Sequence, residues 1–366
     1  MLIGIDASRA NQNERTGVEW YGYHVISELA KLDSKNRYRL YTWEPLRDGL
    51  ATLPDNFEEV IVPNRRFWVH TALSWELQRN KVDRLYVPSH VVPLIHPANT
   101  TVTIHDLGFR QFKENYSWYH YQHLTYNSKW SARWAKNIIV DSEFVRRDVQ
   151  DTYGVDPAKL TVIPLGYDRG MFEETTVKSV TDTMAHYRLK DPYLLFIGRL
   201  EARKNVARLI EAFYRLTDSG LFGGQLVLAG NPGVGYDEIR TLISKQRKPD
   251  QIIQPGYISS ESRSALLKGA RAFVFPSLYE GFGIPILEAF AAGTPVLTSD
   301  RGAPAEVAGD AALLIDPTSV DEIHQGLERL LADQALADRL AAAGLKRSNE
   351  YGWDRTAASV HKVLTG

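Results

Sequence analysis

The segment YEGFGIPILEAFAAG, residues 279–293, places one carboxylate, Glu280, just before a glycine pair and a second, Glu288, eight residues later. Gly281 and Gly283 let the backbone approach a ligand closely and point its N–H groups outward. An ionised carboxylate accepts two hydrogen bonds in a fork, so a pair of vicinal hydroxyls is its ideal partner. Sugars and ribose both offer such pairs.

A helix is predicted directly after the glycine pair. Pro285 fits its first turn, where no N–H is needed, and Gly293 suits the position just beyond its end. The run LEAFAA is too apolar for a face turned to solvent. A glycine loop beside a helix N-terminus is an anion site, so we expect phosphate there, each charge-assisted hydrogen bond contributing roughly 1.5–3 kcal/mol.

These features together predict a site for a nucleotide diphosphate sugar. Sugar hydroxyls would meet Glu280, the phosphates would meet the loop, and the ribose would meet Glu288. The simpler alternative is a plain turn followed by an ordinary surface glutamate.

A dinucleotide-binding oxidoreductase is the rival from another class, and it needs the pattern G-x-G-x-x-G. Ile286 stands where the third glycine belongs. The other glycine cluster, GNPGVG at 230–235, has the wrong spacing, and we predict no helix after it. The pattern therefore disfavours a dehydrogenase.

The elements that must position this site alternate short apolar strands with amphipathic helices, which is typical of parallel sheets built from βαβ units. Helices are predicted over 18–32 and over 142–154, the latter with Ser142 as its N-cap and Gly154 as its stop. Strands are predicted in the first half at 2–6, 39–43, 58–62, 84–88, 101–106, 137–141 and within 160–168.

A polar stretch reaching about residue 190 separates this half from a second α/β set. The second set has predicted strands at 193–200, 225–230, 252–258, 272–277 and 295–300, and helices over 204–217 and 260–270. We expect two Rossmann-like, doubly wound domains facing each other across a cleft, with ligands at the carboxyl ends of the strands. The expected bounds are 1–175 and 186–348, followed by a terminal helix in 349–366.

Composition narrows the function classes. The 366 residues include 43 basic and 44 acidic side chains, well mixed, so the charge gives no reason to expect nucleic acid. No cysteine is present, which excludes disulfides, thiolate metal sites and a cysteine nucleophile. The first apolar run meets Asp6 too early for a signal peptide, and we expect a cytoplasmic protein.

The stretch from FPSLYEGFGIPILEAF to ALLIDP, residues 275–317, resembles the signature region of the retaining GT-B glycosyltransferases of family four, including the spacing of Glu280 and Glu288. FIGRLEARKN (196–205), PGYIS (255–259) and VTIHDLGF (102–109) resemble further motifs of that family. Further resemblances lie in VDSEFVRRDV (140–149), VIPLGYD (162–168) and the terminal YGWDRTAASVHKVL (351–364). The resemblance therefore covers nearly the whole chain.

The resemblance implies a role for each matching position. Arg199 and Lys204 would bind the donor diphosphate, Glu288 the ribose, and Glu280 the donor sugar near the reacting centre. The remaining implied site residues are His105 beside the sugar, Gly17 where the diphosphate and acceptor approach, Tyr257 and Ile258 beside the nucleobase, and Phe282, Gly283, Ile284 and Leu287 along the donor.

For three of these positions a purely structural role is the alternative to ligand binding. Arg199 and Lys204 could be a solvated pair at a strand end, and His105 a core histidine satisfied by a backbone group. The neighbouring Asp106 is interpreted as a turn acceptor rather than a catalytic group.

The resemblance implies retaining transfer of a hexose, with mannose from GDP-mannose as the first choice and a UDP-sugar as the alternative. The diphosphate would leave first, and its oxygen would take the acceptor's proton; double displacement on Glu280 is the less favoured route. No Asp-x-Asp motif is present, so we expect no metal and no other cofactor. An inactive nucleotide-sugar-binding homologue is the non-enzyme alternative.

The acceptor is expected to be a glycan or a lipid-linked glycan. NRRFWVH (64–70) and the aromatic tract at 109–134 supply rings and cations that suit sugar faces or an anionic membrane. The plainer prediction is that most of these rings pack a helix against its own sheet. Contact with the inner membrane face as a peripheral protein is left open.

Overall fold

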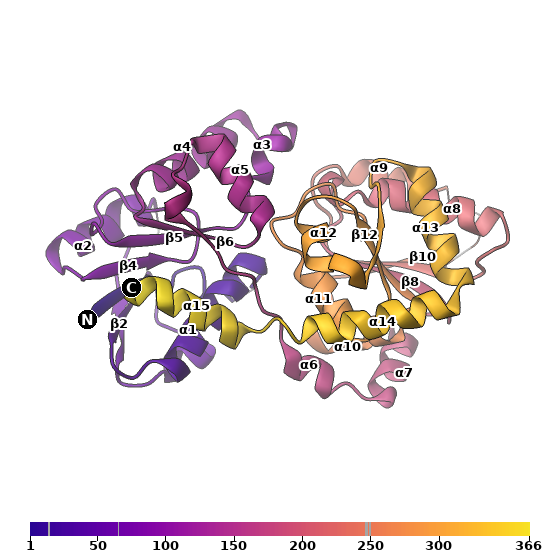
Figure 1. Ribbon diagram of the computed structural model, residues 1–366, viewed down its shortest axis with the longest axis horizontal. Coiled ribbons are helices and arrows are strands. Elements are labelled where there is room, and N and C mark those ends of the chain that lie inside the picture. Colours follow the sequence, from indigo (N-terminus) through magenta and orange to yellow (C-terminus); the bar gives the residue numbers. More distant parts are fainter. Residues whose placement is uncertain (14, 65, 246–247, 249) are drawn as a thin grey trace. The chain divides into compact units, whose positions relative to one another are not determined.

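The chain forms two compact α/β units in a computed structural model, which describes residues 1–13, 15–64, 66–245, 248 and 250–366 (Figure 1). The first unit comprises residues 1–166 and 353–366, and the second comprises residues 167–352. The first division falls before the expected end at 175. The C-terminal helix belongs to the first unit, although the whole second unit precedes it in the chain.

The first unit is built on seven parallel strands in the order β3-β2-β1-β4-β5-β6-β7. All residues of β5 are buried, as expected for a parallel strand covered on both faces. The strands are β1 (Leu2–Asp6), β2 (Arg37–Thr42), β3 (Phe57–Ile61), β4 (Arg84–Val87), β5 (Thr100–Ile104), β6 (Asn137–Val140) and β7 (Leu160–Val162).

Helices cover this sheet, and the yellow α15 lies beside the violet α1 in Figure 1. The predicted caps of α5 are confirmed: the Ser142 hydroxyl accepts from the Val145 N–H at 3.2 Å, and Gly154 has a φ of 61°. The helices are α1 (Gly17–Leu32), α2 (Ser74–Arg79), α3 (Gly108–Gln111), α4 (Trp118–Trp134), α5 (Glu143–Tyr153) and α15 (Trp353–Thr365), with a π-helical turn at Val69–Leu73.

The second unit is built on six parallel strands in the order β10-β9-β8-β11-β12-β13. They are β8 (Tyr193–Ile197), β9 (Gln225–Ala229), β10 (Ile252–Gly256), β11 (Ala272–Phe275), β12 (Val296–Ser299) and β13 (Leu313–Ile315). The helices are α6 (Arg169–Glu173), α7 (Val177–His186), α8 (Val206–Asp218), α9 (Tyr236–Ile243), α10 (Ser260–Gly269), α11 (Ile284–Ala291), α12 (Gly302–Ala308), α13 (Val320–Ala332) and α14 (Gln334–Ser348).

The structure corrects two sequence-based expectations. A helix, α9, does follow the glycine cluster at 230–235, although we predicted none. The aromatic tract also differs: the buried face of α4 consists of Asn127, Ser128, Ser131 and Ala132, while most of its rings are exposed or only partly covered. Small side chains let α4 approach its neighbours closely, so the large rings turn outward. In the other aromatic segment, Arg65 lies outside the described residues.

Among the described helices, none is both long enough and apolar enough to cross a bilayer.

Candidate active site

The site is positioned by the switch point of the second sheet. Strand β8 pairs with β9 on one side and with β11 on the other, so chain order reverses between β8 and β11. The loops that follow these two strands therefore lie side by side at the carboxyl edge of the sheet. Open α/β sheets bind ligands at such points.

Asn205 joins the two loops. Its side-chain amide donates to the carbonyl of Pro276 at 3.0 Å and to that of Pro317 at 2.6 Å, and it is buried. The Leu278 N–H donates to the carbonyl of Arg203 at 3.0 Å. These hydrogen bonds fix the backbone that carries Lys204 and Glu280 at the ends of the strands.

Glu280 is a buried carboxylate held by two cations. The Lys204 Nζ lies 2.5 Å from its Oε1, and the Arg203 Nη1 lies 3.4 Å from its Oε2. Burial raises the pKa of Glu280, but the charges of Lys204 and Arg203 outweigh burial and leave the pKa below its usual value. The carboxyl group is therefore ionised at neutral pH, and it cannot serve as a general acid there.

The helix predicted after the glycine pair is α11, which follows Gly283 with Pro285 in its first turn. Gly283 has a φ of 122°, which only glycine adopts without strain. Phe282 and Leu287 are buried and Ile284 is partly buried, while Gly293 has a φ of 72° just past the helix end. The predicted loop–helix geometry is thus confirmed, including the burial of the LEAFAA face.

Glu288 is buried on α11 and pairs with an arginine from another helix. The Arg263 Nη1 lies 3.0 Å from Oε1 and 3.3 Å from Oε2 of Glu288. The charge of Glu288 raises the pKa of Arg263 above its usual range, against the effect of burial. Each of the two glutamates is therefore buried and already has a cationic partner.

Arg199 differs from Lys204, because its side chain is exposed and makes no hydrogen bond or ion pair with any described residue. It lies against the loop at 230–235, where a Cβ on Gly233 would stand 2.8 Å from the Arg199 Cγ. Gly230 is equally constrained, since a Cβ there would meet the carbonyl oxygen of Gly198 at 2.0 Å. The glycines of GNPGVG thus let two strand-end loops pack backbone against backbone.

The segment at 255–259 ends β10 and leads into α10. Tyr257 is largely exposed, and Ile258 is buried. Ser259 caps α10 by accepting from the Ser262 N–H at 3.2 Å. The exposed ring and the capped helix stand beside the Arg263 end of the site, because Arg263 lies in the first turn of α10.

His105 lies in the first unit, after β5, and both its ring nitrogens have partners. Nδ1 lies 2.8 Å from Asp141 Oδ2, and Nε2 lies 3.0 Å from the Pro88 carbonyl. Burial lowers the pKa of His105, but the Asp141 carboxylate raises it more, so the net pKa is raised. The interpretation of Asp106 as a turn acceptor is confirmed, because its Oδ1 accepts from the Gly108 N–H at 2.9 Å.

Gly17 begins α1 in the first unit, and a Cβ built there meets no heavy atom within 4 Å. Nothing within the described structure therefore requires a glycine at this position for packing.

Within the second unit the structure brings together Lys204, Glu280 and α11 with its loop, and it pairs Glu288 with α10. Our sequence reasoning missed Arg203 and Arg263. Arg203 adjoins Lys204 and could have been suspected from the run ARKN. Arg263 stands 25 residues before Glu288 on another helix, and no local pattern connects the two.

Comparison with known proteins identifies the class. WaaG, a glycosyltransferase involved in lipopolysaccharide biosynthesis, shares the fold over 100% of both chains with a TM-score of 0.78 at 19% sequence identity. The Anabaena protein HepE, solved with UDP and glucose, gives a TM-score of 0.76 at 15% identity over 100% of this chain and 99% of its own. The two parallel-sheet, Rossmann-like units therefore form a GT-B fold.

Two family models assign the chain to a glycosyltransferase family. The model described as glycosyl transferases group 1 matches residues 184–347, and that of glycosyltransferase family 4 matches residues 16–170. The chain belongs to the family 4 glycosyltransferases and is an enzyme of that class.

Its relatives include mannosyltransferases. The O-antigen chain mannosyltransferase B of Escherichia coli is 28% identical over 92% of this chain and 86% of its own length. The MMP alpha-(1->4)-mannosyltransferase of Mycolicibacterium hassiacum is 30% identical over 63% of this chain and 54% of its own.

Proposed function

We propose that the protein transfers a hexose, with retention of configuration, from a nucleotide diphosphate sugar to a hydroxyl of a glycan or a lipid-linked glycan. Mannose from GDP-mannose is the first choice of donor. The observation that carries the proposal is the pair of buried glutamates, each with a cationic partner, on either side of a glycine loop and a helix N-terminus.

The donor would lie along this segment as the spacing of its groups suggests. Glu288 would accept from the ribose hydroxyls, the loop N–H groups and the start of α11 would hold the phosphates, and Glu280 would accept from the sugar. Backbone groups of Phe282, Gly283 and Ile284, with Leu287 behind them, would form one wall. Tyr257 and Ile258 would border the base, because they stand next to α10.

In the reaction the bond from the sugar C1 to the diphosphate oxygen breaks, and a bond from C1 to the acceptor oxygen forms on the same face. The acceptor's proton goes to the departing phosphate oxygen, so no protein base is needed. Developing negative charge on the phosphate would be stabilised by Arg199, whose exposed guanidinium is uncommitted among the described residues, and by Lys204. These cations would replace a metal ion, and we propose metal-independent transfer.

Mannosyltransferases among the relatives favour GDP-mannose. HepE, which was solved with UDP-glucose, supports a UDP-sugar as the alternative donor. His105 and Gly17 are proposed to contribute from the first unit, His105 as a fixed ring rather than as a base, since both of its ring nitrogens already have hydrogen-bond partners. An inactive binding homologue is disfavoured, because Glu280, Glu288, Arg199 and Lys204 are all present.

A thermal-shift panel tests the donor site. GDP, UDP, ADP and their sugars are added to the protein with and without EDTA. A ligand at 100 times its Kd should add about 2.7 kcal/mol of stability. We expect the largest shift with GDP or GDP-mannose, unchanged by EDTA. If no nucleotide raises the melting temperature, the donor-site assignment is wrong; if EDTA abolishes the shift, metal independence is wrong.

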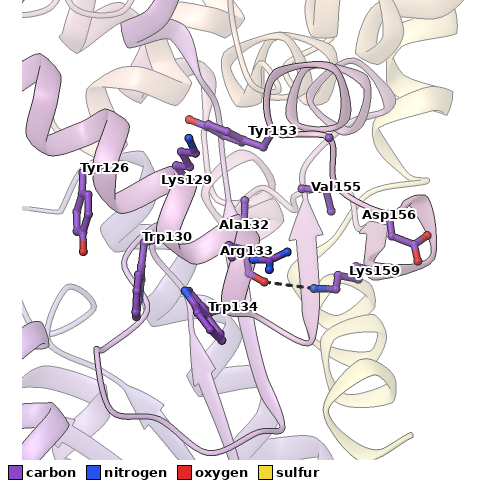
Figure 2. Close-up of a pocket in the computed structure, with 11 residues that line it drawn as sticks. Tyr126, Lys129, Trp130, Ala132, Arg133, Trp134, Tyr153, Val155, Asp156 and Lys159 are labelled. Atoms are coloured by element: carbon purple, nitrogen blue, oxygen red, sulfur yellow. Dashed lines mark hydrogen bonds between the residues drawn. The ribbon is translucent and has the colours of Figure 1, made fainter.

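We further propose a cytoplasmic enzyme in peripheral contact with the inner membrane face through α4. Figure 2 shows the rings of Tyr126, Trp130 and Trp134 in a row along this helix, beside Lys129 and Arg133. They line a cavity of about 630 Å³. Exposed aromatic rings with neighbouring cations suit the headgroup region of an anionic bilayer, where a lipid-linked acceptor would be presented.

Vesicle pelleting tests this contact. The double variant Tyr126→Ser with Trp134→Ser should lose binding to anionic vesicles, while Trp75→Ser, which removes an equally exposed ring from α2, should not. Absence of vesicle binding by the unmodified protein, together with good turnover of a soluble sugar, would refute the membrane contact and the lipid-linked acceptor.

A further inference from the structure

Arg263 pairs with Glu288 but has no role in the proposed reaction. Its side chain is 31% exposed and that of Glu288 is 7% exposed, so the pair is largely shielded from solvent. One nitrogen, Nη1, faces both carboxylate oxygens, at 3.0 and 3.3 Å. A donor shared between the two oxygens restrains rotation of the carboxylate about the Cγ–Cδ bond. When the group rotates, at least one of the two hydrogen bonds to Nη1 is lost.

Arg263 is mounted on a helix that cannot easily shift. Ser259 caps α10, and the hydroxyl of Ser264, one residue after Arg263, accepts from Thr175 at 2.6 Å. Near the other end, the Lys268 Nζ donates to the carbonyls of Phe172 and Thr175 at 2.5 and 2.9 Å. These contacts hold α10, which carries Arg263, against the chain that precedes α7.

The two motif glutamates differ in how many cations hold them. Glu280 has Lys204 and Arg203, whereas Arg263 is the one lysine or arginine within 4 Å of the Glu288 carboxylate among the described residues. Loss of Arg263 would leave Glu288 buried without a counter-charge, and such a carboxylate tends to protonate or to turn toward water. Either change would spoil a hydrogen-bond acceptor aimed at a ligand.

We infer that Arg263 is a positioning residue that holds the Glu288 carboxylate in the orientation in which it accepts from the two ribose hydroxyls of the donor. The inference rests on the proposed role of Glu288. Nη1 lies on one side of the carboxylate and occupies one lone pair of each oxygen at most. Since an ionised carboxylate has about four acceptor positions, enough remain for a diol. Arg263 thus acts through Glu288 and needs no contact with the nucleotide.

Calorimetric titration with matched nucleotides tests the inference. GDP or UDP, whichever binds the unmodified protein more tightly, is compared with its 2′,3′-dideoxy analogue. We expect the unmodified protein to prefer the ribonucleotide by about tenfold or more, the value of one charge-assisted hydrogen bond. Arg263→Met should reduce this preference to less than about twofold, and Arg263→Lys, which keeps the charge, should retain part of it.

Three comparisons make the outcome decisive. Arg271→Met is the matched control, because Arg271 belongs to the same unit and its side chain donates to the carbonyl of Leu331 rather than to Glu288, so it should keep full preference. If Arg263→Met retains full preference while Glu288→Gln loses it, the positioning role is wrong and the proposed function stands. If the unmodified protein shows no preference, the ribose-binding role of Glu288 is wrong and the positioning role of Arg263 is wrong with it, while glycosyl transfer itself is judged by the donor-binding panel. A purely structural role would lower the melting temperature of both Arg263 variants and leave the preference intact, which also overturns the inference.

Discussion

At the scale of single residues, the site depends on how burial and charge are balanced at two carboxylates. Glu280 is buried, yet its pKa lies below the usual value of 4.5 because the charges of Lys204 and Arg203 exceed the effect of burial. A sequence can predict that two acids flank a glycine loop. It could not predict which cations neutralise them, since Arg203 is one of several nearby arginines and Arg263 comes from a different helix.

Replacing Glu280 by Gln should lower kcat by about tenfold or more with little change in nucleotide affinity. The reason is that Glu280 is expected to contact the sugar at the reacting centre, where its interaction strengthens in the transition state. Steady-state kinetics with a fixed acceptor measures the effect. An increase in KM at unchanged kcat would assign Glu280 to ground-state binding instead.

At the scale of elements, apolar runs predicted the buried strands well, because each pairs in parallel and is covered on both faces. Strand β13 was missed because it has only three residues, two of them partly or fully exposed. Helix α7 was missed because most of its residues are polar and none is fully buried. For α4 only the plainer of two predictions, that most rings pack against the sheet, was wrong, since periodicity alone does not reveal that Asn127, Ser128 and Ser131 lie on the buried face.

Replacement by alanine should affect stability differently at the glycines that begin two helices, Gly283 and Gly17. Gly283→Ala places a side chain at a φ of 122° and should cost about 1–3 kcal/mol of stability, with weaker nucleotide binding. Gly17→Ala meets nothing within 4 Å, so its stability should be unchanged. A loss of turnover in Gly17→Ala without loss of melting temperature would support ligand approach there. Unchanged turnover would remove Gly17 from the site.

Asp33 links α15 to the rest of the first unit. It accepts from Tyr38 at 2.6 Å and from the His361 Nε2 at 2.9 Å. Burial raises the pKa of Asp33, but the hydrogen bonds from Tyr38, Asn36 and the Lys35 and Asn36 amides lower it well below its usual value of 3.8. Its carboxylate therefore stabilises the fold above pH 3.8, and this contribution is lost as the pH falls through the folded-state pKa.

Asp33→Asn should accordingly reduce the free energy of unfolding at pH 7 by about 1.5–3 kcal/mol. The difference from the unmodified protein should shrink below pH 3.8, where the unfolded carboxyl of the unmodified protein is protonated. Urea unfolding at pH 7 and at pH 3 measures both values. A difference that is the same at both pH values would show that the charge of Asp33 does not contribute.

At the scale of the whole molecule, two units share one chain, and only the second is continuous in sequence. A polar stretch predicted the approximate division. It could not place the division at 166, because α6 and α7 pack with α10 through contacts that are distant in sequence. We expect the fragment 167–352 to fold alone and to bind the nucleotide with an affinity within about tenfold of the intact protein.

Circular dichroism and titration of the purified fragment test that expectation. A folded fragment that binds no nucleotide would show that groups of the first unit are essential for nucleotide binding.

The most direct test of the central claim is calorimetric titration of GDP and UDP into the unmodified protein and into Glu288→Gln. The account predicts saturable binding of one nucleotide per chain, weakened by about tenfold or more in the variant, because an amide replaces the charged acceptor for the ribose hydroxyls. Equal affinity in both proteins, or no binding of either nucleotide to the unmodified one, would contradict it.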